Sequence, residues 1–352
     1  MTLREAPAPV EGDSASGGDD SSTVRQVYSD DGPGVVSVDV ASSETGPGGG
    51  SGFVVDGEGH IVTNQHVVEG AEGVSVRFAS GAREKAEIVG EDPSTDVAVI
   101  KVDAPKSVLK PLAFGDSDSA QVGDAVIAIG NPLNVGLSVT TGIVSGTERP
   151  ITAPNNYTID GAIQTDAAIS SGNSGGPLLD AGGSVIGINS QVASAGSQGV
   201  AQGVGFAVPG NTVKSVVEQL INSGEAVHGY IGVKMFEIGL EELRAYTTLT
   251  EKELRDDYGL PATGAIVTDI APGGPADEVG IKGGDNEDMG GIQVPVGDVI
   301  TEVRGEPVAS ADDVIRAVNA SKPGDRLKLT VVSPNEKPRS VEVTLESQPD
   351  DA

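Results

Sequence analysis

The stretch DAAISSGNSGGPLLD, residues 166–180, places one serine among glycines and just before an apolar run. Ser174 lies between Gly172 and the pair Gly175–Gly176. Glycine lets the backbone turn tightly and lets another group come close. A serine held there has an accessible hydroxyl beside free backbone N–H groups, which are the parts of a nucleophile and an oxyanion hole. Taken alone, the motif favours a Gly/Ser turn between two strands, so the rest of the chain must decide.

The composition favours a β-rich protein of more than one domain. The chain has 352 residues, which is enough for two or three domains, and it contains 50 glycines but only 5 phenylalanines and 5 tyrosines. It contains no cysteine, which excludes disulfides, thiolate metal sites and a cysteine nucleophile.

The charge is strongly acidic, at −30, from 52 acidic and 22 basic residues. Because the acids are spread from Glu11 to Asp351, they indicate a solvated surface of the kind found in salt-adapted organisms. They argue against nucleic acid as a ligand, since its phosphates would be repelled. No run is apolar enough to span a membrane, and the N-terminus lacks a signal pattern. Residues 1–24 are polar and acidic, and we expect a disordered leader there.

Short apolar runs alternate with turns from Val35 to Val208, and their lengths are typical of strands. Examples are GVVSVDV (34–40), SGFVVD (51–56), HIVTN (60–64), DVAVIKV (96–102), DAVIAIG (124–130), SVIGIN (184–189) and VGFAVP (204–209). A helix is then predicted over residues 211–223, with Asn211 as N-cap, apolar residues at helical spacing and Gly224 after its end. It closes the first of two bodies.

A serine nucleophile at neutral pH needs a base, usually histidine, and a carboxylate that orients the imidazole. Of three histidines, His66 stands at the end of a strand-like run, from which a side chain can emerge. Among the many acids, Asp96 leads directly into an apolar strand, which would place its carboxylate at the margin of a core. Each of these residues, alone, is more often structural than catalytic.

Four motifs in one order resemble the trypsin-like serine proteases of the HtrA (Deg) family. They are TNQHVV (63–68), DPSTDVAVIKV (92–102), QTDAAISSGNSGGPLL (164–179) and GVGFAVP (203–209). The resemblance covers residues 25–222 and implies an all-β, two-barrel chymotrypsin-like protease domain. It implies His66 as general base, Asp96 as its orienting acid and Ser174 as nucleophile, with the backbone N–H groups of Gly172, Asn173 and Ser174 as the oxyanion hole.

The resemblance also implies a specificity pocket with Ile169, Gln191 and Val204 in its wall. Ordinary strand packing explains Ile169 and Val204 about as well. Gln191 departs from the small or apolar residue typical of the family, which puts the depth of the pocket in doubt. The stretch SSG before Asn173 also departs from the usual Asn-Pro-Gly or Asn-Arg-Gly.

Three other motif interpretations fail. Residues 172–176 fit the G-x-S-x-G elbow of α/β-hydrolases, but that fold needs alternating helices and a histidine after the serine, where only His228 is available. Residues 45–53, TGPGGGSGF, lack the Gly-Lys-Ser/Thr of a phosphate loop. Residues 283–291, GGDNEDMGG, lack the ligand pattern of a calcium loop, and a solvated acidic insertion is expected there.

The second body, residues 223–348, resembles a PDZ domain of the type attached to HtrA proteases. Its loop GYIGV (229–233) implies that Tyr230, Ile231, Gly232 and Val233 bind a peptide carboxylate while the peptide adds a strand. The acidic insertion, residues 285–295, interrupts the match. Residues 349–352 are left as a tail.

The predicted function is hydrolysis of peptide bonds in misfolded or exported proteins through an acyl-enzyme, with no metal or organic cofactor. The PDZ domain would bind substrate or regulatory C-termini. The family resemblance implies a homotrimer, with Tyr28 and Phe206 at its contact, and an extracytoplasmic or cell-surface location. Two alternatives stay open: a regulatory protease with one dedicated substrate, and a non-catalytic holding protein of the same fold, which the complete set of His66, Asp96 and Ser174 disfavours.

Overall fold

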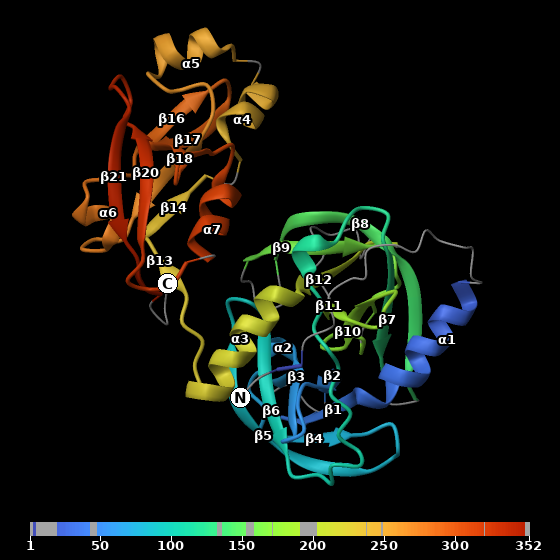
Figure 1. The fold of residues 1–352 in the computed structure, drawn as a ribbon. Coiled ribbons are helices and arrows are strands. Elements are labelled where there is room, and N and C mark those ends of the chain that lie inside the picture. The colour runs from blue at the N-terminus through green and yellow to red at the C-terminus, as the bar shows by residue number, and fades with distance from the viewer. Residues whose placement is uncertain are drawn as a thin grey trace. The chain divides into compact units, whose positions relative to one another are not determined.

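A computed structural model describes residues 3–4, 20–42, 48–131, 136–152, 158–170, 172–190, 203–236, 238–247, 249–319 and 321–348. The chain divides into two compact units, Met1–Ala226 and Val227–Ala352 (Figure 1). The predicted domain boundary, between residues 222 and 223, falls shortly before that division.

Six strands of the first unit close into a barrel, in the order β1-β2-β3-β6-β5-β4. Closure leaves no strand edge unpaired, and Val and Ile suit the buried face of each strand. The strands are β1 (Val35–Ala41), β2 (Gly48–Val54), β3 (His60–Thr63), β4 (Gly73–Arg77), β5 (Arg83–Asp92) and β6 (Val97–Val102).

A second barrel follows in the order β10-β11-β12-β9-β8-β7. Its strands are β7 (Ala125–Gly130), β8 (Ser138–Thr152), β9 (Thr158–Thr165), β10 (Pro177–Asp180), β11 (Val185–Ser190) and β12 (Gly205–Pro209). One cluster of buried side chains includes residues of both barrels, among them Phe53 and Ile129. The ring of Phe53 also packs against that of Phe114 in the connecting segment, with centroids 6.0 Å apart. The barrels therefore share one core.

The helical segments described beside the barrels are α1 (Asp20–Asp31), η1 (Gly32–Gly34), α2 (Gln65–Val68), η2 (Ser117–Ser119) and α3 (Gly210–Ser223). Helix α3 confirms the predicted helix, and Gly224 ends it with a left-handed φ of 83°. The predicted N-cap was wrong, because the helix begins at Gly210 and the side chain of Asn211 donates instead to Asp116, at 2.8 Å. Helix α1 takes in residues 20–24, where the sequence predicted a disordered leader.

The second unit is a β-sheet with short helices. Its main sheet runs β14-β15-β18-β20-β21, with β19 beside β18. The strands are β13 (Gly229–Tyr230), β14 (Val233–Met235), β15 (Ala265–Ile270), β16 (Asp285–Met289), β17 (Ile292–Val296), β18 (Val299–Val303), β19 (Glu306–Pro307), β20 (Arg326–Val332), β21 (Arg339–Thr344) and β22 (Glu346–Ser347). The helices are α4 (Leu240–Thr247), α5 (Glu251–Asp257), α6 (Pro275–Glu278) and α7 (Ala311–Asn319).

The acidic insertion of the second unit is a hairpin, β16–β17 (Figure 1). Residues 285–288 are exposed, as expected of a solvated insertion, but Met289 and Val294 are fully buried in a cluster with leucines of α4 and α5. The carboxylate of Asp298 accepts a hydrogen bond from the backbone N–H of Lys282, at 3.2 Å, across the base of the hairpin. Lys282 and Asp298, on either side of the insertion, therefore stay hydrogen-bonded to each other.

The predicted all-β class is confirmed, with two barrels followed by a smaller β-domain. Among the helices of the described residues, none is both long and apolar enough to cross a membrane.

Candidate active site

His66 and Asp96 lie in direct contact. Strand β3 ends at Thr63, and the four-residue helix α2 carries His66 immediately after it. The Nδ1 atom of His66 is 2.9 Å from each carboxylate oxygen of Asp96, and the backbone N–H of His66 donates to Oδ1 at 3.0 Å. The side chain of Asp96 is fully buried, whereas that of His66 keeps 16% of its surface exposed. The pair thus has a shielded acid and an accessible imidazole.

The backbone of Asp96 holds this geometry. Asp96 has a left-handed φ of 56°, which aspartate tolerates better than most residues. Its carbonyl accepts from the backbone N–H of Gln65, at 3.2 Å, and from the side-chain amide of Asn64, at 2.9 Å. The turn before β6 and the start of α2 are therefore joined by both the backbone and the side chain of Asp96.

Ser190, at the end of β11, donates from its hydroxyl to Asp96 Oδ2 at 3.1 Å. A buried carboxylate is costly unless it is hydrogen-bonded, and Asp96 accepts from Ser190 and twice from His66. An ionised carboxylate only accepts hydrogen bonds, so it selects the His66 tautomer with the proton on Nδ1. The lone pair of Nε2 is then available to a proton donor.

Ser174 lies in a turn that the first barrel and β11 hold. The carbonyl of Ser174 accepts from the N–H of Ser51 on β2, at 2.8 Å, and the N–H of Gly175 donates to the carbonyl of Asn189, at 2.9 Å. A Cβ added at Gly50 would lie 2.8 Å from the carbonyl oxygen of Ser174 and 2.9 Å from the side chain of Val67. The turn that contains Ser174 and the side chain of Val67, the residue after His66, therefore both pack against Gly50 of β2.

The turn before Ser174 has a defined shape. The N–H of Asn173 donates to the carbonyl of Ser170 at 2.9 Å, and Gly172 has a φ of 96°. A positive φ is strained for residues with a side chain, which explains glycine at position 172. Among the described residues, neither the N–H of Gly172 nor that of Ser174 donates to an acceptor, and the Ser174 hydroxyl has no partner. As far as the described residues show, these groups are available to a ligand.

Glycine is also required directly after Ser174. A Cβ at Gly175, whose φ is 85°, would lie 2.1 Å from the carbonyl oxygen of Ser51. A Cβ at Gly176 would lie 2.2 Å from that of Ile129. The glycines of the stretch 166–180 therefore let the turn pack tightly against both barrels.

The predicted pocket residues are partly brought together. Ile169 is half-buried, and its side chain lies over β12, where a Cβ at Gly205 would be 2.5 Å from Cγ1 of Ile169. Val204, the neighbour of Gly205, is exposed. Gln191 lies outside the described residues. The assignment of these residues to a pocket stays a prediction.

The predicted carboxylate loop of the second unit runs from β13 into β14. Ile231 is buried, Gly232 has a φ of 72°, and their carbonyls accept from Ala276 and Ala271 respectively, each at 2.9 Å. Strand β14, which begins at Val233, pairs on one side with β15 and is the edge of its sheet. Tyr230, on β13, pairs instead with β22.

The two aromatics predicted at a subunit contact differ in exposure. Tyr28, on α1, is 40% exposed. Phe206, on β12, is half-buried and packs against the core shared by the barrels.

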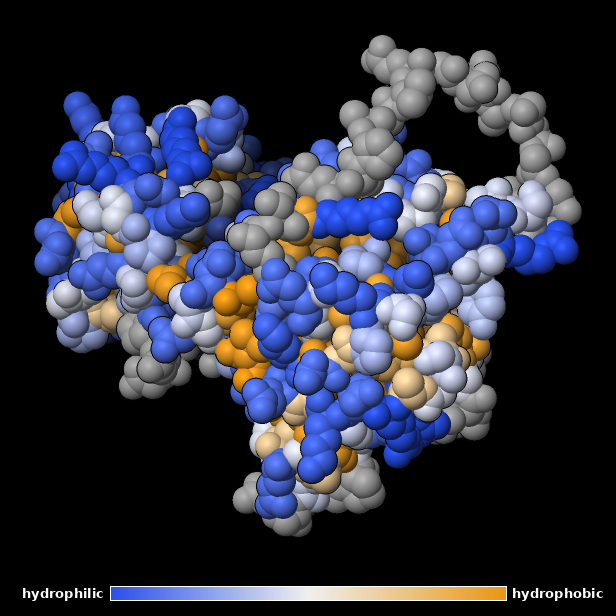
Figure 2. Space-filling model, turned by 60° about the horizontal axis from the view of Figure 1, so that its bottom comes forward, coloured by the Kyte–Doolittle hydropathy of each residue, from blue (hydrophilic) through white to orange (hydrophobic). Residues whose placement is uncertain are grey.

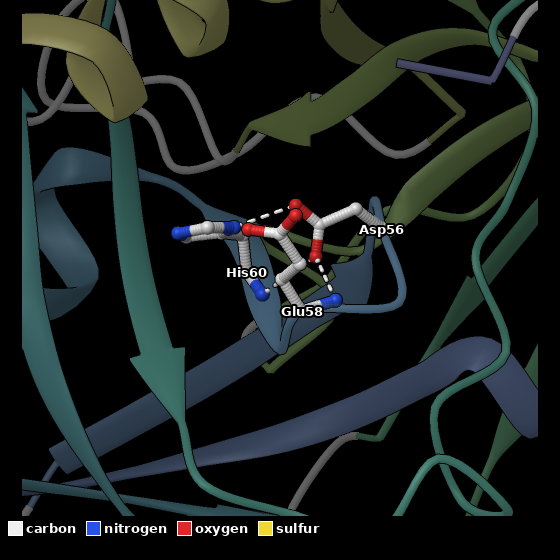
Figure 3. Close-up of side chains that lie close together, drawn as sticks. All are labelled: Asp56, Glu58 and His60. Atoms are coloured by element: carbon white, nitrogen blue, oxygen red, sulfur yellow. Dashed lines mark hydrogen bonds and ion pairs between the residues drawn. The ribbon is translucent and has the colours of Figure 1, made fainter. Parts of the chain in front are cut away.

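One group found among the described residues could bring ligands to a metal ion: Asp56 and Glu58, between β2 and β3, with His60, the first residue of β3 (Figure 3). Asp56 Oδ1 accepts from the backbone N–H groups of Glu58 and His60, at 2.8 and 3.1 Å. Asp56 Oδ2 lies 2.5 Å from Nδ1 of His60. Both oxygens of Asp56 are thus engaged in holding the turn.

Three polar residues at the site were not predicted: Ser51, Asn131 and Ser190. Ser51 is buried in the middle of β2, and Ser190 is buried at the end of β11. A polar side chain at a buried strand position was the available signal, since buried hydroxyls need partners.

Comparison with known proteins identifies the family of each unit. The family model of the trypsin-like peptidase domain matches residues 50–188, and that of the PDZ domain matches residues 229–345. The protein named Protease Do-like 1, chloroplastic, of Arabidopsis thaliana is 39% identical over 311 residues, which cover 88% of this chain and 66% of that protein. A probable periplasmic serine endoprotease, DegP-like, of Brucella suis biovar 1 is 40% identical over 302 residues, or 86% of this chain and 53% of that protein.

The chain thus spans about half to two thirds of the length of these relatives. Among solved structures, the HtrA-type protease AlgW with tripeptide matches with a TM-score of 0.72 and 31% identity, over 93% of this chain and 97% of that one. The match includes both units. The chain therefore belongs to the family of HtrA-type serine proteases, with a trypsin-like peptidase domain followed by a PDZ domain.

Proposed function

We propose that this chain is a serine endopeptidase in which Ser174 is the nucleophile, His66 the general base and Asp96 the acid that orients it. The observation that carries the proposal is the contact of His66 Nδ1 with a fully buried Asp96 carboxylate, at 2.9 Å. A non-catalytic holding protein has no need of this arrangement, because a buried carboxylate that serves only structure can be replaced by apolar packing.

In the proposed reaction, the Ser174 hydroxyl attacks the carbonyl carbon of the scissile peptide bond while Nε2 of His66 takes its proton. The resulting imidazolium is stabilised by Asp96, to which Nδ1–H stays bonded. His66 then gives the proton to the leaving amine, which departs and leaves an acyl ester on Ser174. Water, deprotonated by His66, hydrolyses that ester and regenerates the serine.

The negative charge that develops on the substrate oxygen needs donors that are already in place. The N–H groups of Gly172 and Ser174 fit this role, because both lack an acceptor among the described residues. The N–H of Asn173 is engaged by Ser170. We therefore assign the oxyanion hole to Gly172 and Ser174, with Asn173 shaping the turn between them rather than donating.

The second unit is proposed to bind peptide C-termini. The open edge of β14 can accept a further strand, and the loop of residues 230–233 precedes it. The proposed substrates are misfolded or exported proteins in an extracytoplasmic compartment, since the relatives are named periplasmic or chloroplastic proteases. Assembly as a homotrimer through Tyr28 and Phe206 is part of the same proposal.

The test is labelling with a serine-directed fluorophosphonate, with and without an unfolded protein, together with cleavage of that protein. Wild type should be labelled on one residue and should cleave the substrate, whereas Ser174→Ala should do neither. The matched control is Ser117→Ala, which removes another buried hydroxyl, one that contacts Asp118 and Asn211. Binding of unfolded protein without labelling or cleavage by wild type would overturn the proposal in favour of a holding protein.

A further inference from the structure

We infer that Ser51, on β2 of the first barrel, is a positioning residue. Its hydroxyl holds the proposed oxyanion-binding turn, Gly172–Ser174, in the conformation that the structure shows. The inference rests on the proposed function, because it concerns the same turn. It begins from the peptide group between Gly172 and Asn173. Its carbonyl oxygen accepts from the Ser51 hydroxyl at 2.6 Å, and its N–H donates to Ser170 at 2.9 Å.

These two bonds fix the orientation of that peptide, because a trans peptide is planar and its C=O and N–H point in opposite directions. The next peptide is fixed in the same way, since the carbonyl of Asn173 accepts from the N–H of Gly176 at 3.0 Å. The N–H of Ser174 must then point away from that bond. The free N–H groups of Gly172 and Ser174 thus flank a peptide whose carbonyl is engaged by Ser51.

The direction of the Ser51 hydrogen bond is also determined. The backbone N–H of Asn131 donates to Ser51 Oγ at 2.8 Å. Since a backbone N–H can only donate, the Ser51 oxygen is the acceptor in that contact, and its single proton is free for the carbonyl of Gly172. Ser51 is completely buried, so water does not compete for that proton.

Asn131 is itself held in place. Its side-chain amide donates to the hydroxyl of Ser37, and its Oδ1 accepts from the N–H of Gly136 at 3.1 Å. Ser37 and Ser51 are direct partners in the β1–β2 ladder, and both are buried. Ser37 on β1 and Asn131 after β7 therefore hold Ser51 in place, and Ser51 binds the carbonyl of Gly172.

Without the Ser51 hydroxyl, the carbonyl of Gly172 would have no partner where it now points. Glycine tolerates both signs of φ, so the turn could then adopt other conformations at little cost, and the N–H groups beside Ser174 would lose their fixed direction. The bond matters in the transition state, when the oxyanion forms, and not for the binding of substrate side chains. It should therefore affect kcat and not KM.

The experiment compares Ser51→Ala with wild type by kcat and KM on a peptide substrate, and by the affinity of a peptide boronate, which forms a tetrahedral adduct with an active serine. Loss of a direct oxyanion donor lowers kcat by about 10²–10³-fold, and Ser51 acts through Gly172, so we expect about a tenfold fall. The boronate affinity should fall by the same factor, and KM should stay within about twofold. Ser117→Ala is the matched control and should change none of these values.

Ser51→Cys keeps the shape of the side chain and leaves no cavity, but it offers only a weak S–H donor. If Ser51→Ala proves unstable, kcat and boronate affinity should fall in Ser51→Cys instead. An unchanged kcat in folded Ser51→Ala or Ser51→Cys would overturn the inference, as would a rise in KM at constant kcat. Wild type that neither cleaves peptides nor reacts with a fluorophosphonate would instead overturn the proposed function itself.

Discussion

Ser190 and Asp96 are joined by a hydrogen bond of 3.1 Å, from the Ser190 hydroxyl to Oδ2, although they belong to different barrels. The residue before Ser190, Asn189, accepts from the N–H of Gly175 directly after Ser174. One end of β11 therefore supports both the acid and the serine turn.

We expect Ser190→Ala to lower kcat by about tenfold or more, because a hydrogen bond to a charged group contributes about 1.5–3 kcal/mol and the carboxylate would be left less well paired. Steady-state cleavage of a peptide, with Ser117→Ala as control, measures the effect. Activity equal to wild type would contradict this prediction. It would mean that the two hydrogen bonds from His66 are enough to keep the Asp96 carboxylate in place.

Replacing Asp96 with Asn should lower kcat by about 10⁴-fold, because an amide can stabilise the wrong tautomer of His66 and cannot stabilise its charged form. His66→Ala should abolish cleavage. Both variants should keep the near-UV circular dichroism of wild type. A folded Asp96→Asn protein with more than a tenth of wild-type kcat would contradict the assigned role of Asp96.

The order and type of the main elements could be predicted from the sequence, because buried strands need β-branched runs and tight turns need glycine. The stretch 166–180 shows this directly: the positions of Gly172 and Gly175 have positive φ. The contact of His66 with Asp96 was predicted from family resemblance, since the sequence alone offered more than fifty acids as candidates.

Other features depend on contacts that no local pattern reveals. Helix α1 has a mean hydropathy below zero, so its residues 20–24 resemble a solvated leader. The hairpin β16–β17 buries Met289 and Val294 in a cluster with leucines of α4 and α5, although residues 285–288 of β16 are exposed and mostly acidic. Ser51 and Asn131 are single polar residues that bond to each other and to partners across the two barrels, far away in the sequence.

Salt should stabilise the protein. The 52 acidic and 22 basic residues leave a net charge of −30, and Figure 2 shows hydrophilic residues over much of the face in view. Mutual repulsion destabilises a compact state until ions screen it, within about 3 Å at molar concentration. Tm should therefore rise between dilute buffer and molar potassium chloride, as measured by scanning calorimetry. A flat or falling Tm would contradict this.

Asp31→Asn should stabilise the first unit at neutral pH. Burial, together with the charge of Asp30, raises the pKa of Asp31. The folded state thus holds this proton more tightly than the unfolded chain, so stability falls as the pH rises through the window between the ordinary aspartate value and the raised one. Above that window the variant should have the higher Tm, and in acid the gain should disappear. The same gain at both pH values would indicate an effect unrelated to titration.

The proposed trimer predicts unequal effects for Tyr28 and Phe206. A fully buried aromatic ring contributes about 4–6 kcal/mol, from 150–250 Å² at 25 cal/mol/Å². Tyr28 is 40% exposed and so has surface left to bury at a contact, whereas Phe206 already packs against the shared core. Tyr28→Ala should therefore shift the mass seen by light scattering at high salt from about three chains toward one, with little change in Tm at low protein concentration. Phe206→Ala should lower Tm first, because loss of a core ring lowers the free energy of unfolding by about 3–5 kcal/mol, reduced here by the partial exposure of Phe206. A wild-type monomer at micromolar concentration would refute the assembly, and a trimer unaffected by Tyr28→Ala would refute the residue.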